Sequence, residues 1–305
     1  MFSWIKKSLF FLLSSVAIFV GAEDTRDWYS ESLYDSWKQS FRISKIIYEQ
    51  KSDLFDLLVF ENSIFGRVLA MDGAIQVTEN DEYVYQEMIT HVPLIAHGNV
   101  ESVLVIGGGD GGALREVLRH KQVKKIVLVE IDPTVIDLSK KYFPMICKNA
   151  FSDPRVEIVI QDGTEYVKTV KSRFDVIICD STDPIGPGKV LFMPEFYANC
   201  KKILRKGGIF VNHAGVPFLQ KETLPMVSKD LRRSFSKVNF YVAAIPTYVG
   251  GFMAFGFASD NVYTNLKLEV IQKRLQEVTG TMKYYNADIH KASFALPNFI
   301  EDMQK

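Results

Sequence analysis

The amino-acid sequence predicts an α/β protein in which a small N-terminal antiparallel β domain precedes a doubly wound, mostly parallel sheet. From residue 102 onward, short apolar runs alternate with helical patterns, which is typical of parallel strands covered by helices on both faces. Between residues 43 and 77, strand-like runs follow one another with no helical pattern between them, which indicates antiparallel pairing.

The overall composition excludes several classes of protein. The 305 residues include 36 basic and 36 acidic side chains, so the chain lacks the basic excess that a nucleic-acid partner usually requires. An apolar fraction of 47% is that of an ordinary globular protein and excludes a disordered or collagen-like chain. The three cysteines are too few for a disulfide framework, and the sequence has no HExxH or CxxC pattern, so we expect no metal site.

The first 22 residues have the layout of a targeting segment. Lys6 and Lys7 precede a mostly apolar run over residues 8–20, and the small pair Gly21-Ala22 follows. This order is typical of a secretory signal, and the run is shorter than the ~20 apolar residues that span a bilayer. Export, membrane tethering through residues 1–22, and a disordered extension on a cytoplasmic protein all stay open.

Residues 23–80 are predicted to form the β domain, and residues 81–305 the larger sheet with its helices. In the β domain, Asn62-Ser63 and Asp72-Gly73 predict turns between short strands, whereas the polar residues 28–40 suggest no strand. The expected strands are 43–48, 54–60, 67–71 and 74–77, and a helix over 79–91 follows them, shortly before Pro93.

In the larger domain, apolar runs predict the strands, and amphipathic stretches between them predict the helices. Because ligands bind outside the carboxyl ends of such strands, the loops after Ile106, Val129, Ile160 and Asp180 are the candidate site. The expected parallel strands are 103–106, 126–130, 156–160, 176–180 and 209–212; the helices are 114–119, 133–142, 165–170 and 195–204; a final antiparallel pair is 238–245 and 252–258.

The first of these loops, Gly107 to Gly112, is rich in glycine, follows a strand and opens a helix. Its glycines allow a ligand to approach the backbone closely, although a merely tight turn is the alternative. The loop satisfies the pattern GxGxxG, so a dinucleotide must be considered. The Asp110 carboxylate argues against it, because it would repel a pyrophosphate and attract a cationic ligand instead.

Two further carboxylates follow the next two strands. Glu130 lies about twenty residues after the glycines, where a carboxylate accepts hydrogen bonds from ribose hydroxyls. Asp162, which precedes Gly163, can accept a hydrogen bond from an exocyclic amine such as that of adenine. The alternative for Asp162 is an N-cap of the next helix, which is also the interpretation favoured for Asp132, followed by Pro133.

The last loop carries an acidic pair. Asp180 and Asp183 stand at the end of an apolar strand, and two prolines stiffen the residues that follow. Such a pair attracts a cation and can take a proton from it, although a turn rich in Asp and Pro is the alternative. With Asp110 on the same rim, and Glu82 and Glu87 expected nearby on the preceding helix, the pocket is predicted to bind a polyamine or another ammonium compound.

Several long strings along the chain resemble those of one family: LAMDGAIQ over 69–76, ENDEYVYQEM over 79–88, GGGDGG over 107–112, DSTDPIGP over 180–187 and IPTY over 245–248. From about Glu31 to the C-terminus, the chain resembles the spermidine synthases, the polyamine aminopropyltransferases. The resemblance implies a Rossmann-like sheet of the class I methyltransferase type. It also implies transfer of an aminopropyl group from decarboxylated S-adenosylmethionine to putrescine, giving spermidine and methylthioadenosine. The donor is a co-substrate, so no cofactor and no metal are implied.

The same resemblance implies roles for single residues. Asp180 matches the general base of the family, and Asp110 matches the partner of the donor's aminopropyl ammonium. The donor site is expected from Gln86, Asp110, Glu130, Asp162, Gly163 and Pro187; the acceptor site from Tyr85, Asp180, Ser181, Thr182, Asp183 and Tyr248; and the glycine loop from Gly107, Gly108, Gly109 and Gly111.

Two positions depart from the family's pattern. Phe55 stands where the family usually has a glutamine that contacts the nucleoside, and Gln50 is out of register to replace it. Val249 follows Tyr248 where a second aromatic residue is usual. We therefore expect weaker donor binding and a looser acceptor pocket.

Other functions stay open on the sequence alone. A small-molecule methyltransferase would share the sheet and the Glu130 contact, an inactive homologue would only bind polyamines or nucleosides, and an NAD oxidoreductase would use the glycine loop. Spermidine, spermine or another polyamine could each be the main product. Members of the family are typically dimers or tetramers, so a homodimer or homotetramer is expected. Because the donor is made in the cytosol, we expect a cytoplasmic enzyme, with membrane contact only through residues 1–22 if at all.

Overall fold

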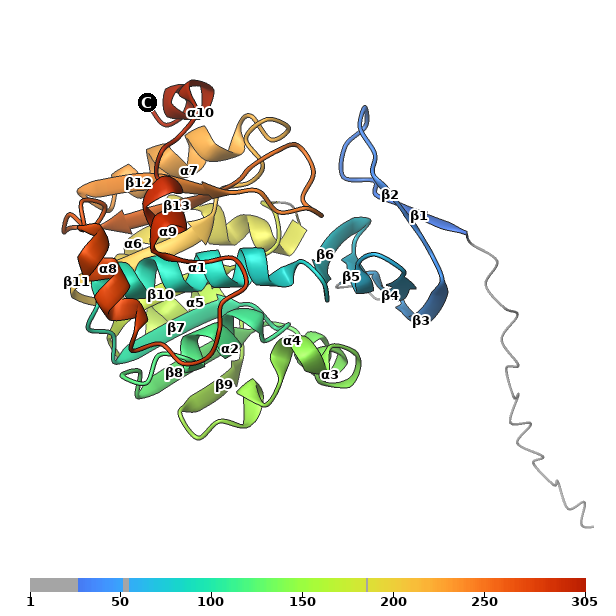
Figure 1. Ribbon diagram of the computed structural model, residues 1–305, viewed down its shortest axis with the longest axis horizontal. Helices are drawn as coiled ribbons and strands as arrows, with labels where there is room; N and C mark the ends of the chain where they lie inside the picture. The colour runs from blue at the N-terminus through green and yellow to red at the C-terminus, as the bar shows by residue number, and fades with distance from the viewer. Residues whose placement is uncertain (1–26, 52–54, 185) are drawn as a thin grey trace, which may run out of the picture.

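The computed structural model describes residues 27–51, 55–184 and 186–305, and the predicted α/β fold is confirmed. A seven-stranded, mostly parallel sheet with helices forms the body of the protein. A separate four-stranded antiparallel sheet lies beside one end of that body (Figure 1). The predicted leader, residues 1–22, lies outside the described residues.

The larger sheet contains β7 (Ser102–Gly107), β8 (Lys125–Glu130), β9 (Val156–Ile160), β10 (Phe174–Asp180), β11 (Leu204–His213), β12 (Lys237–Ala243) and β13 (Met253–Ser259). Its strand order is β12-β13-β11-β10-β7-β8-β9, with β7 to β11 parallel and β12 and β13 antiparallel at one edge. The chain moves outward from β7 through β8 to β9 and then returns to the other side of β7 as β10. The loops after β7 and β10 therefore diverge, which leaves a crevice at their carboxyl ends.

Helices cover both faces of this sheet: α1 (Glu82–His97), α2 (Gly112–Leu118), α3 (Pro133–Tyr142), α4 (Pro144–Cys147), α5 (Gly163–Thr169), α6 (Pro194–Ile203), α7 (Thr223–Arg232), α8 (Leu268–Leu275), α9 (Ala287–Ala292) and α10 (Asn298–Met303). A 3-10 helix, η2 (Gly186–Phe192), precedes α6. The predicted cap of α3 is confirmed, because the Asp132 carboxylate accepts a 2.8 Å hydrogen bond from the Thr134 N–H, with Pro133 at the first helical position. Helices α7 to α10 lie outside the predicted elements.

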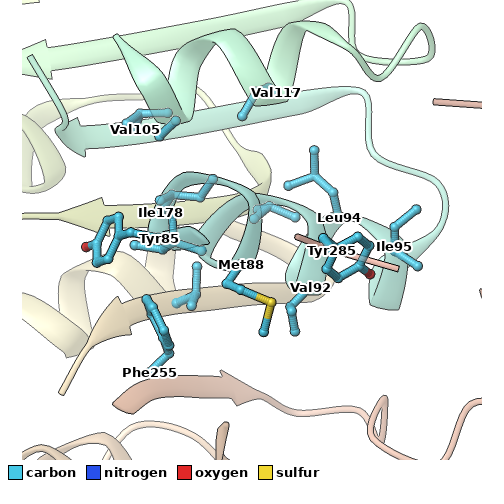
Figure 2. Close-up of a cluster of buried hydrophobic side chains, with 14 of the residues drawn as sticks. Tyr85, Met88, Val92, Leu94, Ile95, Val105, Val117, Ile178, Phe255 and Tyr285 are labelled. Atoms are coloured by element: carbon cyan, nitrogen blue, oxygen red, sulfur yellow. The ribbon is translucent and has the colours of Figure 1, made fainter. Parts of the chain in front are cut away.

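The alternation of side chains along the strands divides the core into two layers. Val103 and Val105 of β7 belong to the layer under α1, α2, α8 and α9, whereas Leu104 and Ile106 belong to the layer under α5, α6, α7 and α10. Figure 2 shows part of the first layer, where Met88 of α1 lies among strand side chains.

The small sheet contains β3 (Lys45–Gln50), β4 (Leu57–Asn62), β5 (Gly66–Met71) and β6 (Ala74–Thr78), each antiparallel to the next. The predicted turn at Asp72-Gly73 is confirmed, since both residues have positive φ (49° and 82°), as a tight hairpin turn requires. One face of this sheet packs against α3 and α4 through an apolar cluster that includes Leu69 and Val135. The small sheet is thereby fixed beside the carboxyl edge of the larger one.

Two expectations about the N-terminal half are wrong. The first helix begins at Glu82 rather than at residue 79, and it continues through Pro93 to His97. All residues from Val84 to Ala96 are buried, so packing outweighs the hydrogen bond that a proline cannot donate. The polar residues 28–40 contribute strand residues, because β1 (Trp28–Ser30) pairs antiparallel with β2 (Ser40–Arg42).

The predicted division of the chain near residue 80 stays a prediction; β6 ends at Thr78, and α1 begins at Glu82. In the part of the chain that the structure describes, no helix is both long and apolar enough to cross a membrane.

Candidate active site

A cavity lies at the carboxyl edge of the larger sheet, where the strand order reverses. The loops after β7, β8, β9 and β10 form one side of it, and apolar residues of the small sheet, including Leu69 and Ile75, form the other. The predicted site residues in its lining are Tyr85, Gln86, Gly107, Gly108, Gly109, Asp110, Glu130, Asp162, Gly163, Asp180, Ser181, Thr182, Asp183 and Tyr248. The loops that were predicted separately therefore meet in one place.

The glycine loop lies directly against the end of β10. The Gly108 N–H donates a 2.8 Å hydrogen bond to the Asp180 carbonyl oxygen. Gly107 has a φ of +76°, and a Cβ atom there would lie 2.0 Å from the same oxygen. Only glycine fits this approach, which brings the loop and the Asp180 carboxylate together.

Asp110 is held inside the loop by two donors. Its Oδ1 accepts a 2.7 Å hydrogen bond from the Gly112 N–H, and its Oδ2 accepts a 2.8 Å bond from Gln86 Nε2. Burial raises the pKa of Asp110, while these bonds and the Arg115 guanidinium act in the opposite direction. The side chains of α1 and the glycine loop thus present a fixed carboxyl group to the cavity.

Asp180 ends β10 and lines the cavity. Burial, and to a smaller degree the neighbouring Asp110 carboxylate, raise its pKa to about 8. The Tyr85 hydroxyl is the hydrogen-bonding neighbour that opposes this rise, and the Oδ2 atom of Asp180 is buried without a partner. Once ionised, a carboxylate with this raised pKa accepts a proton from a bound amine more readily than an ordinary one.

Tyr85 is fixed by aromatic packing. Its ring centroid lies 5.4 Å from that of Phe255 and 5.9 Å from that of Tyr248, the latter in an edge-to-face arrangement. Figure 2 shows the Tyr85 ring beside α1, with its hydroxyl directed away from the apolar cluster. Tyr248 donates its own hydroxyl to the Gln76 carbonyl oxygen of β6, so it joins the two sheets.

Glu130, which ends β8, and Asp162, which follows β9, line the same cavity. Glu130 Oε1 accepts hydrogen bonds from the backbone N–H groups of Ile131 (2.8 Å) and Asp132 (3.1 Å), and burial raises its pKa. Asp162 caps α5 by accepting from the Thr164 N–H at 2.6 Å, and it also lines the cavity. The capping and ligand-binding interpretations of Asp162 are therefore compatible.

Two further lining residues were missed by sequence reasoning. Glu31 is buried, accepts a 2.8 Å hydrogen bond from the Ile75 N–H, and has its pKa raised by burial. His213, at the end of β11, is 1% exposed and lies 3.2 Å from the Thr182 carbonyl oxygen through Nε2. The available signal for His213 was its place at the carboxyl end of a predicted parallel strand.

Two carboxylates of α1 that were expected near the rim of the cavity lie elsewhere. Glu82 pairs with Arg115 at 2.8 Å, and Glu87 accepts the backbone N–H groups of residues 283–285 at 2.8–2.9 Å. The expectation that these two carboxylates join the site is wrong, because both satisfy structural donors.

Two predicted site residues differ from the rest. Gly111 is the N-cap of α2 with a φ of +77°, and a Cβ atom there would meet Cys147 and Phe151, so it faces away from the cavity. The side chain of Pro187 lies outside the described residues. At the departures from the family pattern, Phe55 and Val249 both line the cavity.

The lining of the cavity is rich in acidic side chains. Among the described residues in its lining there is no lysine or arginine, whereas the acidic residues are Glu31, Asp110, Glu130, Asp162, Asp180 and Asp183. No group of three or more His, Cys, Asp or Glu side chains is placed to hold a metal ion within the described ranges. The arrangement can hold an elongated cationic ligand and take a proton from it.

Two family models match most of the chain. The spermine/spermidine synthase domain matches residues 82–269, and the spermidine synthase tetramerisation domain matches residues 27–79.

Two curated relatives match the chain over most of its length. A polyamine aminopropyltransferase of Buchnera aphidicola subsp. Schizaphis graminum (strain Sg) is 48% identical over 271 residues, covering 88% of this chain and 95% of the relative. The polyamine aminopropyltransferase of Shigella flexneri serotype 5b (strain 8401) is 48% identical over 280 residues, covering 92% of this chain and 97% of the relative.

Two solved structures have the same fold. A spermidine synthase in complex with the transition state analogue AdoDATO superposes with a TM-score of 0.86 at 38% identity, covering 93% of this chain and 96% of the other. The spermidine synthase from Thermotoga maritima superposes with a TM-score of 0.83 at 36% identity, covering 93% and 95% of the two chains.

Proposed function

The chain belongs to the spermine/spermidine synthase family, and we propose that its acidic cavity is the active site of a spermidine synthase. The enzyme transfers the aminopropyl group of decarboxylated S-adenosylmethionine to putrescine and releases spermidine and methylthioadenosine. One observation carries the assignment to this cavity: the buried Asp180 carboxyl lies close enough to Asp110 for that carboxylate to raise its pKa, and it shares a single acidic cavity with Asp110 and Asp183.

The donor binds along the glycine loop. Glu130 accepts from the ribose hydroxyls, Asp162 and Gly163 contact the adenine, and Asp110 holds the aminopropyl ammonium. Support comes from the backbone N–H bonds that fix the Glu130 carboxylate and from the Gln86 bond that fixes Asp110. Because Asp110 would repel a second carboxylate, it also disfavours S-adenosylmethionine relative to the decarboxylated donor.

The acceptor must lose a proton before it can react. A primary alkyl amine, like a lysine side chain, has a pKa near ~10.4 and is an ammonium at neutral pH. The Asp180 carboxylate accepts this proton, Tyr85 orients the nitrogen, and Asp183 holds the distal ammonium. The raised pKa of Asp180, about 8, supports this role because it lies closer to that of the amine than an ordinary carboxyl group does.

The amine nitrogen then attacks the carbon attached to the sulfonium sulfur. The new C–N bond forms as the C–S bond breaks, and the electron pair of that bond leaves with sulfur as the neutral thioether methylthioadenosine. The leaving group is already activated, so we propose that the step needs neither a general acid nor a metal ion. Positioning of the two substrates supplies much of the remaining acceleration.

Assembly and location also belong to this proposal. The match of residues 27–79 to a tetramerisation domain supports an oligomer, and we propose a homodimer or homotetramer. We propose a cytoplasmic location because the decarboxylated donor is made there.

A turnover assay on the full chain tests the function. Decarboxylated S-adenosylmethionine is supplied with putrescine or with spermidine, and methylthioadenosine and the polyamine product are quantified. Equal amounts of spermidine and methylthioadenosine from putrescine are expected. Product from spermidine alone would indicate a spermine synthase. A methylated product from S-adenosylmethionine, with no aminopropyl transfer, would refute the proposal in favour of a methyltransferase.

A further inference from the structure

His213 has a hydrogen-bonding arrangement that fixes its tautomer. Its Nε2 lies 3.2 Å from the Thr182 carbonyl oxygen and 3.5 Å from Ser181 Oγ. A carbonyl oxygen can only accept, so Nε2 carries the proton and Nδ1 carries the lone pair. Nδ1 is buried and has no hydrogen-bond partner, and the ring packs edge-on against Phe192 with centroids 5.2 Å apart.

This contact reaches from one strand to the loop of the next. His213 ends β11, which pairs with β10, and Thr182 lies in the irregular segment just after β10. Thr182 is also the residue between Ser181 and Asp183, so its carbonyl group lies in the short link between the two carboxylates of the acceptor site. A donor fixed by the sheet therefore sets the path of that link.

Resting on the proposed function, we propose that His213 is a positioning residue whose Nε2–H holds the Asp180–Asp183 segment in place for the acceptor amine, and that its imidazole must stay neutral, because a proton on Nδ1 keeps this hydrogen bond but adds a charge that opposes binding of the acceptor. The proton comes from solvent, and the imidazolium forms with no other bond made or broken.

The surroundings explain why the second proton would matter. The ionisable groups that line the same cavity as His213 are Asp180 at the end of β10, Asp183 after it, Tyr248 between β12 and β13, and Glu31 and Tyr34 near the N-terminus, and of these Asp183 acts on the pKa of His213. An imidazolium among these groups would compete with the acceptor ammonium for Asp183 and repel the amine. Burial lowers the pKa of His213 more than Asp183 raises it, so the neutral form predominates at pH 7.

Two substitutions separate the hydrogen bond from the titration. His213→Gln keeps an N–H donor but cannot gain a proton, whereas His213→Ala removes both. At pH 8, His213→Ala is expected to raise the KM for putrescine by about 10- to 100-fold because the Thr182 carbonyl loses its donor, with binding of methylthioadenosine unchanged. His213→Gln is expected to recover most of this loss.

The pH profile gives a readout that a purely structural role would not change. The acid limb of kcat/KM for putrescine in the wild-type chain is expected to steepen below pH 6.5 as His213 gains its proton, and this steepening is absent in His213→Gln. His97→Gln is the matched control, since His97 also has a lowered pKa but lies at the end of α1, outside the cavity lining. It should keep the wild-type profile.

The outcomes are distinguishable. If His213→Gln keeps the wild-type steepening, or if His213→Ala leaves the KM for putrescine unchanged, the role of His213 is refuted while the proposed function stands. If the wild-type chain neither turns over nor binds putrescine in calorimetry, the proposed function fails, and the role of His213 fails with it. If His213→Ala does not fold, the His213→Gln profile alone decides the question.

Discussion

Replacing Asp180 by asparagine is expected to stabilise the substrate-free protein while it abolishes most of the activity. Asparagine has nearly the shape of a neutral aspartic acid but cannot ionise. If Asp180 is a buried general base, its ionised form is unfavourable in the folded chain until an ammonium binds. Stability and turnover should therefore move in opposite directions.

The magnitude follows from the pKa. Burial raises the pKa of Asp180 from 3.8 to about 8 in the folded chain, with Asp110 adding to the effect. Between these values the folded state binds more protons than the unfolded state, so this group lowers the free energy of unfolding by about 1.4 kcal/mol per pH unit as the pH rises. The contribution of Asp180 to the free energy of unfolding is therefore most favourable below about pH 4, and it is lost as the pH rises through about 8. At pH 7 the difference from a permanently neutral side chain amounts to about 4 kcal/mol.

Urea unfolding of both proteins between pH 5 and 9, without substrates, measures the effect. Asp180→Asn is expected to be more stable than the wild type at pH 7 by up to about 4 kcal/mol, with a smaller difference at pH 5. Turnover should fall by about 10²–10⁴-fold. Asp137→Asn, at an exposed position of α3, is the control and should change neither quantity. A stability difference that does not grow with pH would refute the reasoning.

Four further results are expected. Asp110→Ala should weaken binding of the decarboxylated donor by about 10- to 100-fold but hardly that of methylthioadenosine, which has no ammonium; equal losses in calorimetry would contradict the assigned contact. Asp183→Asn should raise the KM for putrescine by about tenfold or more without changing that for the donor, and the reverse pattern in steady-state kinetics would be evidence against it. In the wild type, kcat/KM for putrescine should rise with pH and level off above about pH 8, because Asp180 must be ionised to accept a proton; a flat profile would exclude it as the base. Phe55→Gln should tighten donor binding, and an unchanged affinity would mean that Phe55 does not weaken it.

Much of the fold could be predicted because local patterns and tertiary structure agree. The apolar run Val176–Ile178 is continuous since β10 is buried on both faces, and the turn at Asp72-Gly73 uses the residue types that positive φ requires. The first helix was misjudged because Pro93 lies in a fully buried segment, where packing outweighs local propensity. The pair β1 and β2 was missed because its strands are short and largely polar.

For the site, the residues predicted to form it follow strand ends or belong to the strings shared with the spermidine synthases. Glu31 could not be found in this way, because its place depends on a hydrogen bond to Ile75, 44 residues away in sequence. His213 does end a parallel strand, but its proposed role depends on its contact with the Thr182 carbonyl oxygen, 31 residues away in sequence. Such contacts depend on the folded path of the chain rather than on any local pattern.

The small N-terminal sheet supplies part of the substrate-binding wall, so substrate specificity does not depend on the larger domain alone. Its residues Leu69, Met71, Ile75 and Val77 line the cavity, and the Gln39 side chain donates a 2.6 Å hydrogen bond to the Thr247 carbonyl oxygen beside Tyr248. A chimaera that takes its N-terminal segment from a relative would therefore inherit part of the wall against which substrates pack. The segment that matches a tetramerisation domain would carry substrate preference with it, so changes in assembly and in selectivity can arise from the same substitution.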